Sequence, residues 1–255
     1  MSSRPTPVVP PPSATSSAMP LLDPASAPPP PRAWRAPATL WAVGSIAVLT
    51  AIARLVFIGQ GLAGQPVPDD YDGAHYLDHA LVAGSHMVLG IVFVALGPLQ
   101  FSASFRRRFP AWHRVAGRVF VAAGLVMGLG GVWMNAVLPN VGGMLKYVST
   151  HVFGVAMVLS LVLAVLAIRR GDVARHRMWM VRAFAIGLAP ATQRWLLIPV
   201  FVALGEVDDL VIGIGMCAGW IINVAVGEWV LARGRPRASR PAYSSRGRAP
   251  RASAG

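Results

Sequence analysis

Six long apolar runs constrain the fold of this chain more than any other feature. Each reaches about 20 residues, the length that an α-helix needs to cross the hydrocarbon core of a bilayer. With 55% hydrophobic and 13% charged residues, the composition lies outside the range of ordinary water-soluble domains. The sequence therefore predicts an all-α polytopic membrane protein, a bundle of six transmembrane helices over residues 38–59, 80–103, 112–137, 145–168, 176–203 and 208–232.

The loops between these helices alternate in charge, with Asp172 the one acidic residue on the basic side. The basic side carries Arg32, Arg35, Arg106, Arg107, Arg108, Arg114, Arg169, Arg170, Arg175 and Arg177. The other side carries Asp69, Asp70, Asp72, Asp78, Lys146, Glu206, Asp208 and Asp209. By the positive-inside rule both termini are cytoplasmic, so the net charge of +13 indicates orientation and no nucleic-acid partner is predicted.

Two tails flank the six-helix domain of residues 38–232. Residues 1–37 are rich in Pro, Ser and Ala, and residues 233–255 are rich in Arg, so both are predicted to be disordered. The arginine-rich tail, tethered beside the bilayer, is expected to contact anionic lipid headgroups. Cys217 is the single cysteine, which excludes a disulfide framework and a Cys-x-x-Cys-His attachment for a covalent haem.

Four histidines lie one apiece on four consecutive predicted helices. His86 and His151 are about six residues, roughly 9 Å, below the outer ends of their helices. His113 and His176 lie at the inner ends of theirs. This placement predicts an outer pair, His86 with His151, and an inner pair, His113 with His176. Neutral imidazole is a good axial ligand for haem iron, so each pair could clamp one non-covalent haem b.

Neighbouring residues suit a flat anionic macrocycle. Gly90, Gly117 and Gly154 lie three or four positions after a histidine and so share its helical face. Four arginines could neutralise the propionates of an inner haem. These are Arg114, Arg118, Arg177 and Arg182. Lys146 and Arg194 are the cations nearest the outer pair.

Structural explanations stand beside these assignments. Gly often serves close helix packing, and His-Arg pairs at helix ends often anchor the membrane interface. Arg54 and Arg194 would extend to water from the outer ends of their helices, although Gln193 and Arg194 could also face an outer substrate. His75 and His79 could bind a divalent metal, or they belong to an ordinary solvated loop. Asn135, Asn223 and Glu228 are expected to make helix-to-helix hydrogen bonds or to lie at an interface.

Three segments carry a resemblance to a known family. They are HMVLG with GPLQF at 86–90 and 97–101, HRVAGR at 113–118, and HRMWMVR at 176–182. The chain resembles the uncharacterised bacterial membrane proteins grouped as domain of unknown function 2306, which implies the bacterial cytoplasmic membrane. More loosely, it is similar to the six-helix, two-haem cytochromes b. That resemblance implies that His86, His151, His113 and His176 bind haem iron in the same pairing.

The sequence thus leads to two hypotheses. The first is a transmembrane electron carrier with up to two b-type haems that serves a quinone or a small soluble reductant. The second is a non-enzymatic membrane protein, a small-solute transporter or scaffold, whose histidines are structural. No nucleotide-binding glycine motif, nucleophile elbow or metalloprotease motif is present, and no catalytic residue is predicted.

Overall fold

A computed structural model describes residues 35–66, 73–139 and 141–234, and both predicted tails fall almost wholly outside these ranges. Six helices are long and apolar enough to cross a membrane. They are α1 (Arg35–Leu62), α3 (Ala80–Phe101), α5 (Pro110–Val137), α6 (Gly143–Arg169), α7 (Val173–Leu204) and α8 (Asp209–Arg233). Two short helices, α2 (Gly73–Asp78) and α4 (Ala103–Arg108), were not predicted. The part of the chain described here contains no strand, so the all-α polytopic prediction is confirmed.

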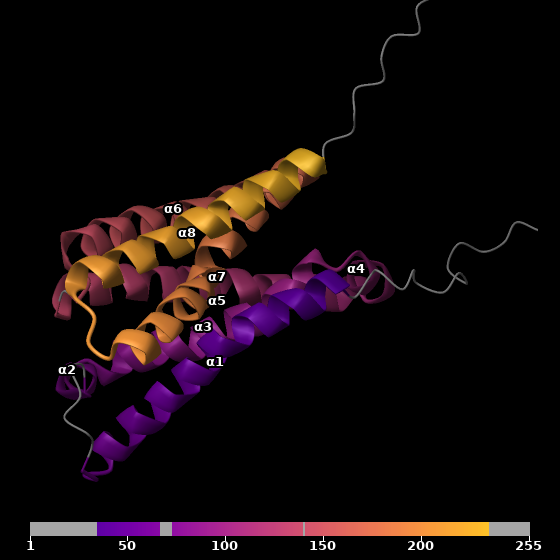
Figure 1. Cartoon of the computed structure of the whole chain (residues 1–255). Helices are drawn as coiled ribbons and strands as arrows, with labels where there is room; N and C mark the ends of the chain where they lie inside the picture. The colour runs from indigo at the N-terminus through magenta and orange to yellow at the C-terminus, as the bar shows by residue number, and fades with distance from the viewer. Residues whose placement is uncertain (1–34, 67–72, 140, 235–255) are drawn as a thin grey trace, which may run out of the picture.

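The six long helices form one bundle in which α5 packs against α3 and α6, and α7 packs against α6 and α8. Helix α1 lies against α3 and α7, and α8 also contacts α6. Figure 1 shows α1 with α3 along one side and α6 with α8 along the opposite side. Helices α5 and α7 lie between these two pairs, and the four histidines are carried by α3, α5, α6 and α7.

Aromatic side chains fill the middle of the bundle. Phe93 of α3 stacks on Phe120 of α5 with ring centroids 4.2 Å apart, and both rings are fully buried. Phe184 of α7 lies beside them, 5.7 Å from Phe93 and 6.1 Å from Phe120. A Cβ atom at Gly97 would overlap the Phe184 ring, so only glycine lets α3 approach α7 here. The centre is closed by interlocking side chains.

The two ends of the bundle differ in charge, and we name them by it. The basic end holds the arginines of α4 and of the α6–α7 turn, whereas the acidic end holds Asp78, Glu206, Asp208 and Asp209. At the basic end the Ser102 hydroxyl accepts a hydrogen bond from the Phe105 N–H, 3.2 Å away, and separates α4 from α3. The Asp172 carboxylate accepts from the Arg175 N–H at 2.9 Å. Helix α7 consequently begins at Val173, three residues before His176.

Candidate functional site

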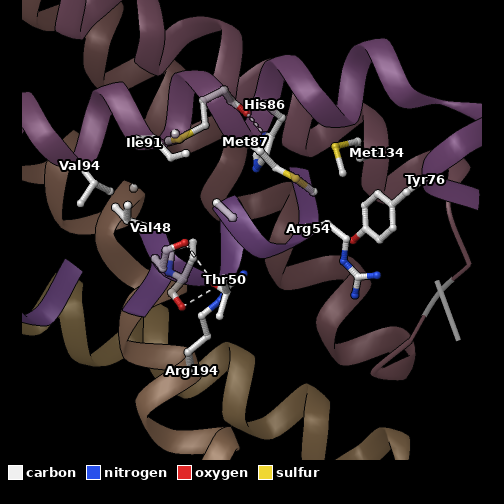
Figure 2. Close-up of a pocket in the computed structure, with 16 residues that line it drawn as sticks. Val48, Thr50, Arg54, Tyr76, His86, Met87, Ile91, Val94, Met134 and Arg194 are labelled. Carbon is white, nitrogen blue, oxygen red and sulfur yellow. Dashed lines mark hydrogen bonds between the residues drawn. The ribbon is translucent and has the colours of Figure 1, made fainter. Parts of the chain in front are cut away.

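A cavity of about 440 Å³ lies in the half of the bundle nearer the acidic end. Residues of α1, α2, α3, α5 and α7 line it. Its polar lining consists of Thr50, Arg54, Tyr76, His86 and Arg194, and Figure 2 shows these side chains among apolar neighbours. No carboxylate belongs to the lining among residues that the structure describes. The cavity therefore places the guanidinium of Arg194 and the imidazole of His86 among aliphatic neighbours.

His86 reaches this cavity from α3. Its Nδ1–H donates to the main-chain carbonyl of Met127 on α5, with 2.8 Å between nitrogen and oxygen. A carbonyl oxygen only accepts, so Nδ1 carries the proton and Nε2 of the neutral ring keeps its lone pair. The ring also packs against Gly130 and Gly131 of α5. This bond orients the imidazole as metal-binding histidines are commonly oriented.

His151 does not line that cavity. Its Nδ1 lies 2.9 Å from the carbonyl oxygen of Tyr147 and 2.9 Å from the amide nitrogen of Asn135 on α5. The Asn135 amide also donates to the Tyr147 carbonyl at 3.0 Å. Asn135 thus links α5 to α6, as the sequence predicted for it. His86 and His151, predicted to form the outer pair, have separate surroundings.

His113 and His176 lie at the same, basic end of the bundle. Each is the fourth residue of its helix, α5 for His113 and α7 for His176. Their side chains are near enough for their charges to influence each other. His176 Nδ1–H donates to the Ala164 carbonyl of α6 at 2.9 Å, which leaves Nε2 available as a ligand atom. Haem ligation by this inner pair stays a prediction.

Some buried side-chain polar atoms of the described residues have no hydrogen-bond partner. Gln100 Nε2, Ser104 Oγ and His113 Nδ1 belong to the basic end, whereas Asn135 Oδ1 and Thr150 Oγ1 lie on α5 and α6 toward the acidic end. A Cβ atom at Gly117, one helical turn from His113, would lie 3.1 Å from Gln100 Oε1. Buried polar groups are rarely left unpaired, because each costs about 1–3 kcal/mol. This corner therefore has hydrogen-bonding capacity for a further group.

The four arginines assigned to the inner pair have different settings. Arg114, Arg118 and Arg177 are exposed at the basic end. Arg182 forms an ion pair with Glu228 of α8, with 2.5 Å between Nε and Oε1, and lies over the Trp179 ring at 4.8 Å. Three of these cations are free to meet an anionic group near the surface, whereas Arg182 is engaged with α8.

The glycines that follow the histidines receive side chains of neighbouring helices. A Cβ atom at Gly90 would lie 3.3 Å from the sulfur of Met127, and one at Gly154 would lie 2.5 Å from Cγ2 of Val132. Gly154 therefore serves helix packing, the structural alternative that the sequence left open, whereas Gly90 packs against Met127 and also lines the cavity.

Three other predicted candidates take part in packing. Gln193 is buried and donates to the Met216 carbonyl of α8 at 2.9 Å, so it does not face the cavity. Asn223 accepts from the Thr192 hydroxyl at 2.8 Å and thereby joins α8 to α7. His79 packs edge-on against Trp133, and no cluster of three or more His, Cys, Asp or Glu is found in the described ranges. Asp69, Asp70 and Asp72, predicted neighbours of His75, lie outside those ranges.

Fold and composition together define a multi-pass α-helical integral membrane protein. The family model of the predicted membrane proteins with domain of unknown function 2306 (DUF2306) matches residues 84–231, more than half of the chain. The chain belongs to this family. The match includes His86, both inner histidines and Arg194, whereas α1 and α2 precede it. No curated protein and no solved structure matches the chain.

Proposed function

We propose that this protein is an integral membrane electron carrier that binds a non-covalent b-type haem between His113 and His176. The observation that supports the proposal most is that these two histidines are each the fourth residue of α5 and of α7 at the basic end, near enough for their charges to interact. Bis-histidine ligation needs two imidazoles facing one space, each with a free ring nitrogen. His176 meets this requirement through its bond to Ala164.

The surroundings of the pair also fit the group. Gln100 and Ser104 offer unpaired hydrogen-bonding atoms, and Arg114 and Arg177 are exposed beside the ligands at the end where carboxylates would meet water. When bound, haem iron supplies one-electron exchange between its ferric and ferrous states. The residues of this chain orient the iron ligands and neutralise the propionates. Helix packing around Phe120 and Phe184 excludes water from the inner side of the site.

The test is the absorption spectrum of the full-length protein, purified after expression with haem supplied. We expect reduced-minus-oxidised bands of a b-type haem, lost in His113→Ala and in His176→Ala. His75→Ala, an exposed substitution on α2, is the matched control and should leave the bands unchanged. A wild-type protein without bound haem, or one whose haem survives both substitutions, overturns the proposal.

Solute transport is the second candidate. The observation in its favour is the positively charged cavity at the acidic half, because an uncompensated cation within a membrane span commonly marks a substrate pathway. Uptake of a labelled organic acid into proteoliposomes, compared with Arg194→Gln, measures it directly. Equal uptake by the two proteins rejects this candidate.

A further inference from the structure

The cavity near the acidic end is a second site, separate from the inner histidines. Its volume of about 440 Å³ falls within the range of small-molecule pockets. We infer that it binds a small organic acid carrying a hydroxyl or amino group, with the carboxylate on Arg194 and the hydrogen-bond donor on His86. The inference does not depend on haem at the inner pair.

Arg194 supplies the positive charge. It lies on α7 ten residues before the end of that helix, and its Nη1 donates to the Pro190 carbonyl at 2.8 Å. Arg175 pairs with Asp172 and Arg182 pairs with Glu228, and no ion pair of Arg194 is found with a described side chain. A guanidinium has five N–H donors, and the bond to Pro190 uses one of them. The others can hold a carboxylate through two parallel hydrogen bonds.

A second arginine, Arg54, lies on the wall of the same cavity. The Arg54 guanidinium of α1 lies over the Tyr76 ring of α2, 4.9 Å from its centroid, and over the Phe57 ring at 5.3 Å. Stacking on two rings holds this charge at the wall. The Arg194 guanidinium, which has no ion-pair partner among the described residues, attracts ligands of the opposite sign more strongly because the walls have a low dielectric constant. The ligand is therefore an anion.

His86 determines what else the ligand must carry. Because Nδ1–H is committed to the Met127 carbonyl, Nε2 presents a lone pair and accepts a hydrogen bond. A carboxylate cannot donate to it, whereas a hydroxyl or amino group can. Figure 2 shows His86 and Arg194 reaching the cavity from opposite sides, so one ligand can contact both.

The rest of the wall limits the body of the ligand. It consists mainly of small and aliphatic side chains, among them Ala47, Val48, Ala51, Ile91 and Val94. The Thr50 hydroxyl does not reach outward, because it donates to the carbonyls of Ile46 and Ala47 in its own helix. A largely apolar body between the two polar ends matches this lining, and a highly charged or sugar-like body does not.

Calorimetry on the full-length protein in nanodiscs tests the inference. The probes are 4-hydroxybutyrate, 6-hydroxyhexanoate and 4-hydroxybenzoate, each beside its amide and its deoxy analogue. We expect at least one hydroxy acid to bind, its amide to bind at least tenfold more weakly, and its deoxy analogue about fivefold more weakly. Absence of binding by all three acids, or equal binding of an acid and its amide, overturns the inference.

Substitutions of Arg194 and His86 test which side chain contacts which group of the ligand. Arg194→Gln should weaken binding at least tenfold, with partial recovery in Arg194→Lys, while Arg175→Gln at the basic end is the matched control. His86→Ala should remove the preference for the hydroxy acid over its deoxy analogue without abolishing binding of the anion. Size-exclusion profiles identify misfolded variants, and a folded Arg194→Lys that binds no better than Arg194→Gln contradicts the role of a positive charge.

The same samples separate this inference from the haem proposal. If His176→Ala loses haem and still binds the acid, both stand. If no haem binds but the acid does, the proposed function fails and the inference stands. A second haem that is lost in His86→Ala would mean that the cavity is a haem site, which overturns the inference and leaves the inner haem intact.

Discussion

The middle of the bundle and its acidic half are built from the same helices but are packed in opposite ways. In the middle, Phe93, Phe120 and Phe184 interlock across α3, α5 and α7 and leave their rings buried. Toward the acidic end, α1 and α7 diverge around a cavity that contains the charged group of Arg194. Tight packing holds the helices in register, and the open half is where a ligand can enter.

The largest expected effect is a loss of stability in the closely packed middle of the bundle. Phe93→Ala removes a fully buried ring from the aromatic cluster and should lower the free energy of unfolding by about 3–5 kcal/mol. Val48→Ala, on the cavity wall, should cost about 1 kcal/mol because its side chain already borders open space. Unfolding in mixed detergent micelles measures both, and equal losses would contradict the contrast.

Larger side chains should also affect the two regions differently: the closely packed middle should lose stability, and the cavity should lose binding. Ala123 of α5 is 2% exposed, so Ala123→Leu must displace its neighbours and should cost about 1–3 kcal/mol. Ala51 borders the cavity, and Ala51→Leu should change stability by less than about 1 kcal/mol while it blocks binding of the organic acid. Thermal unfolding and calorimetry of the two variants check this; a strongly destabilised Ala51→Leu would mean that the cavity closes readily.

The smallest effect concerns the ion pair that secures α8 to α7. The side chains of Arg182 and Glu228 are 29% and 44% exposed, so each is only partly buried by the rest of the protein. A double-mutant cycle with Arg182→Gln and Glu228→Gln should give a coupling of about 1 kcal/mol. The double variant should be less destabilised than the sum of the single ones, and additive losses would show that the pair contributes nothing.

Local sequence signals accounted for much of the fold. The six helices were predicted within three residues at each boundary, since apolar length and flanking charge are properties of the chain itself. The short helix α4 was not predicted, because the apolar run before it was expected to continue as one helix past Ser102. Two signals could have indicated α4: the N-cap residue Ser102 and Pro110 at the start of α5. The matched depths of His113 and His176 also followed from counting residues.

The neighbours of each side chain depended on tertiary structure. The sequence favoured the outer pair, whereas the structure gives His86 and His151 different hydrogen-bond partners and places His113 and His176 at one end of the bundle. Sequence alone determined that the chain forms six helices long and apolar enough to cross a bilayer, and where along them its ionisable groups lie, because both follow from helical rise and hydropathy. Only the tertiary structure decided that Arg194 and His86 share a cavity, because that depends on how packing rotates each helix about its own axis.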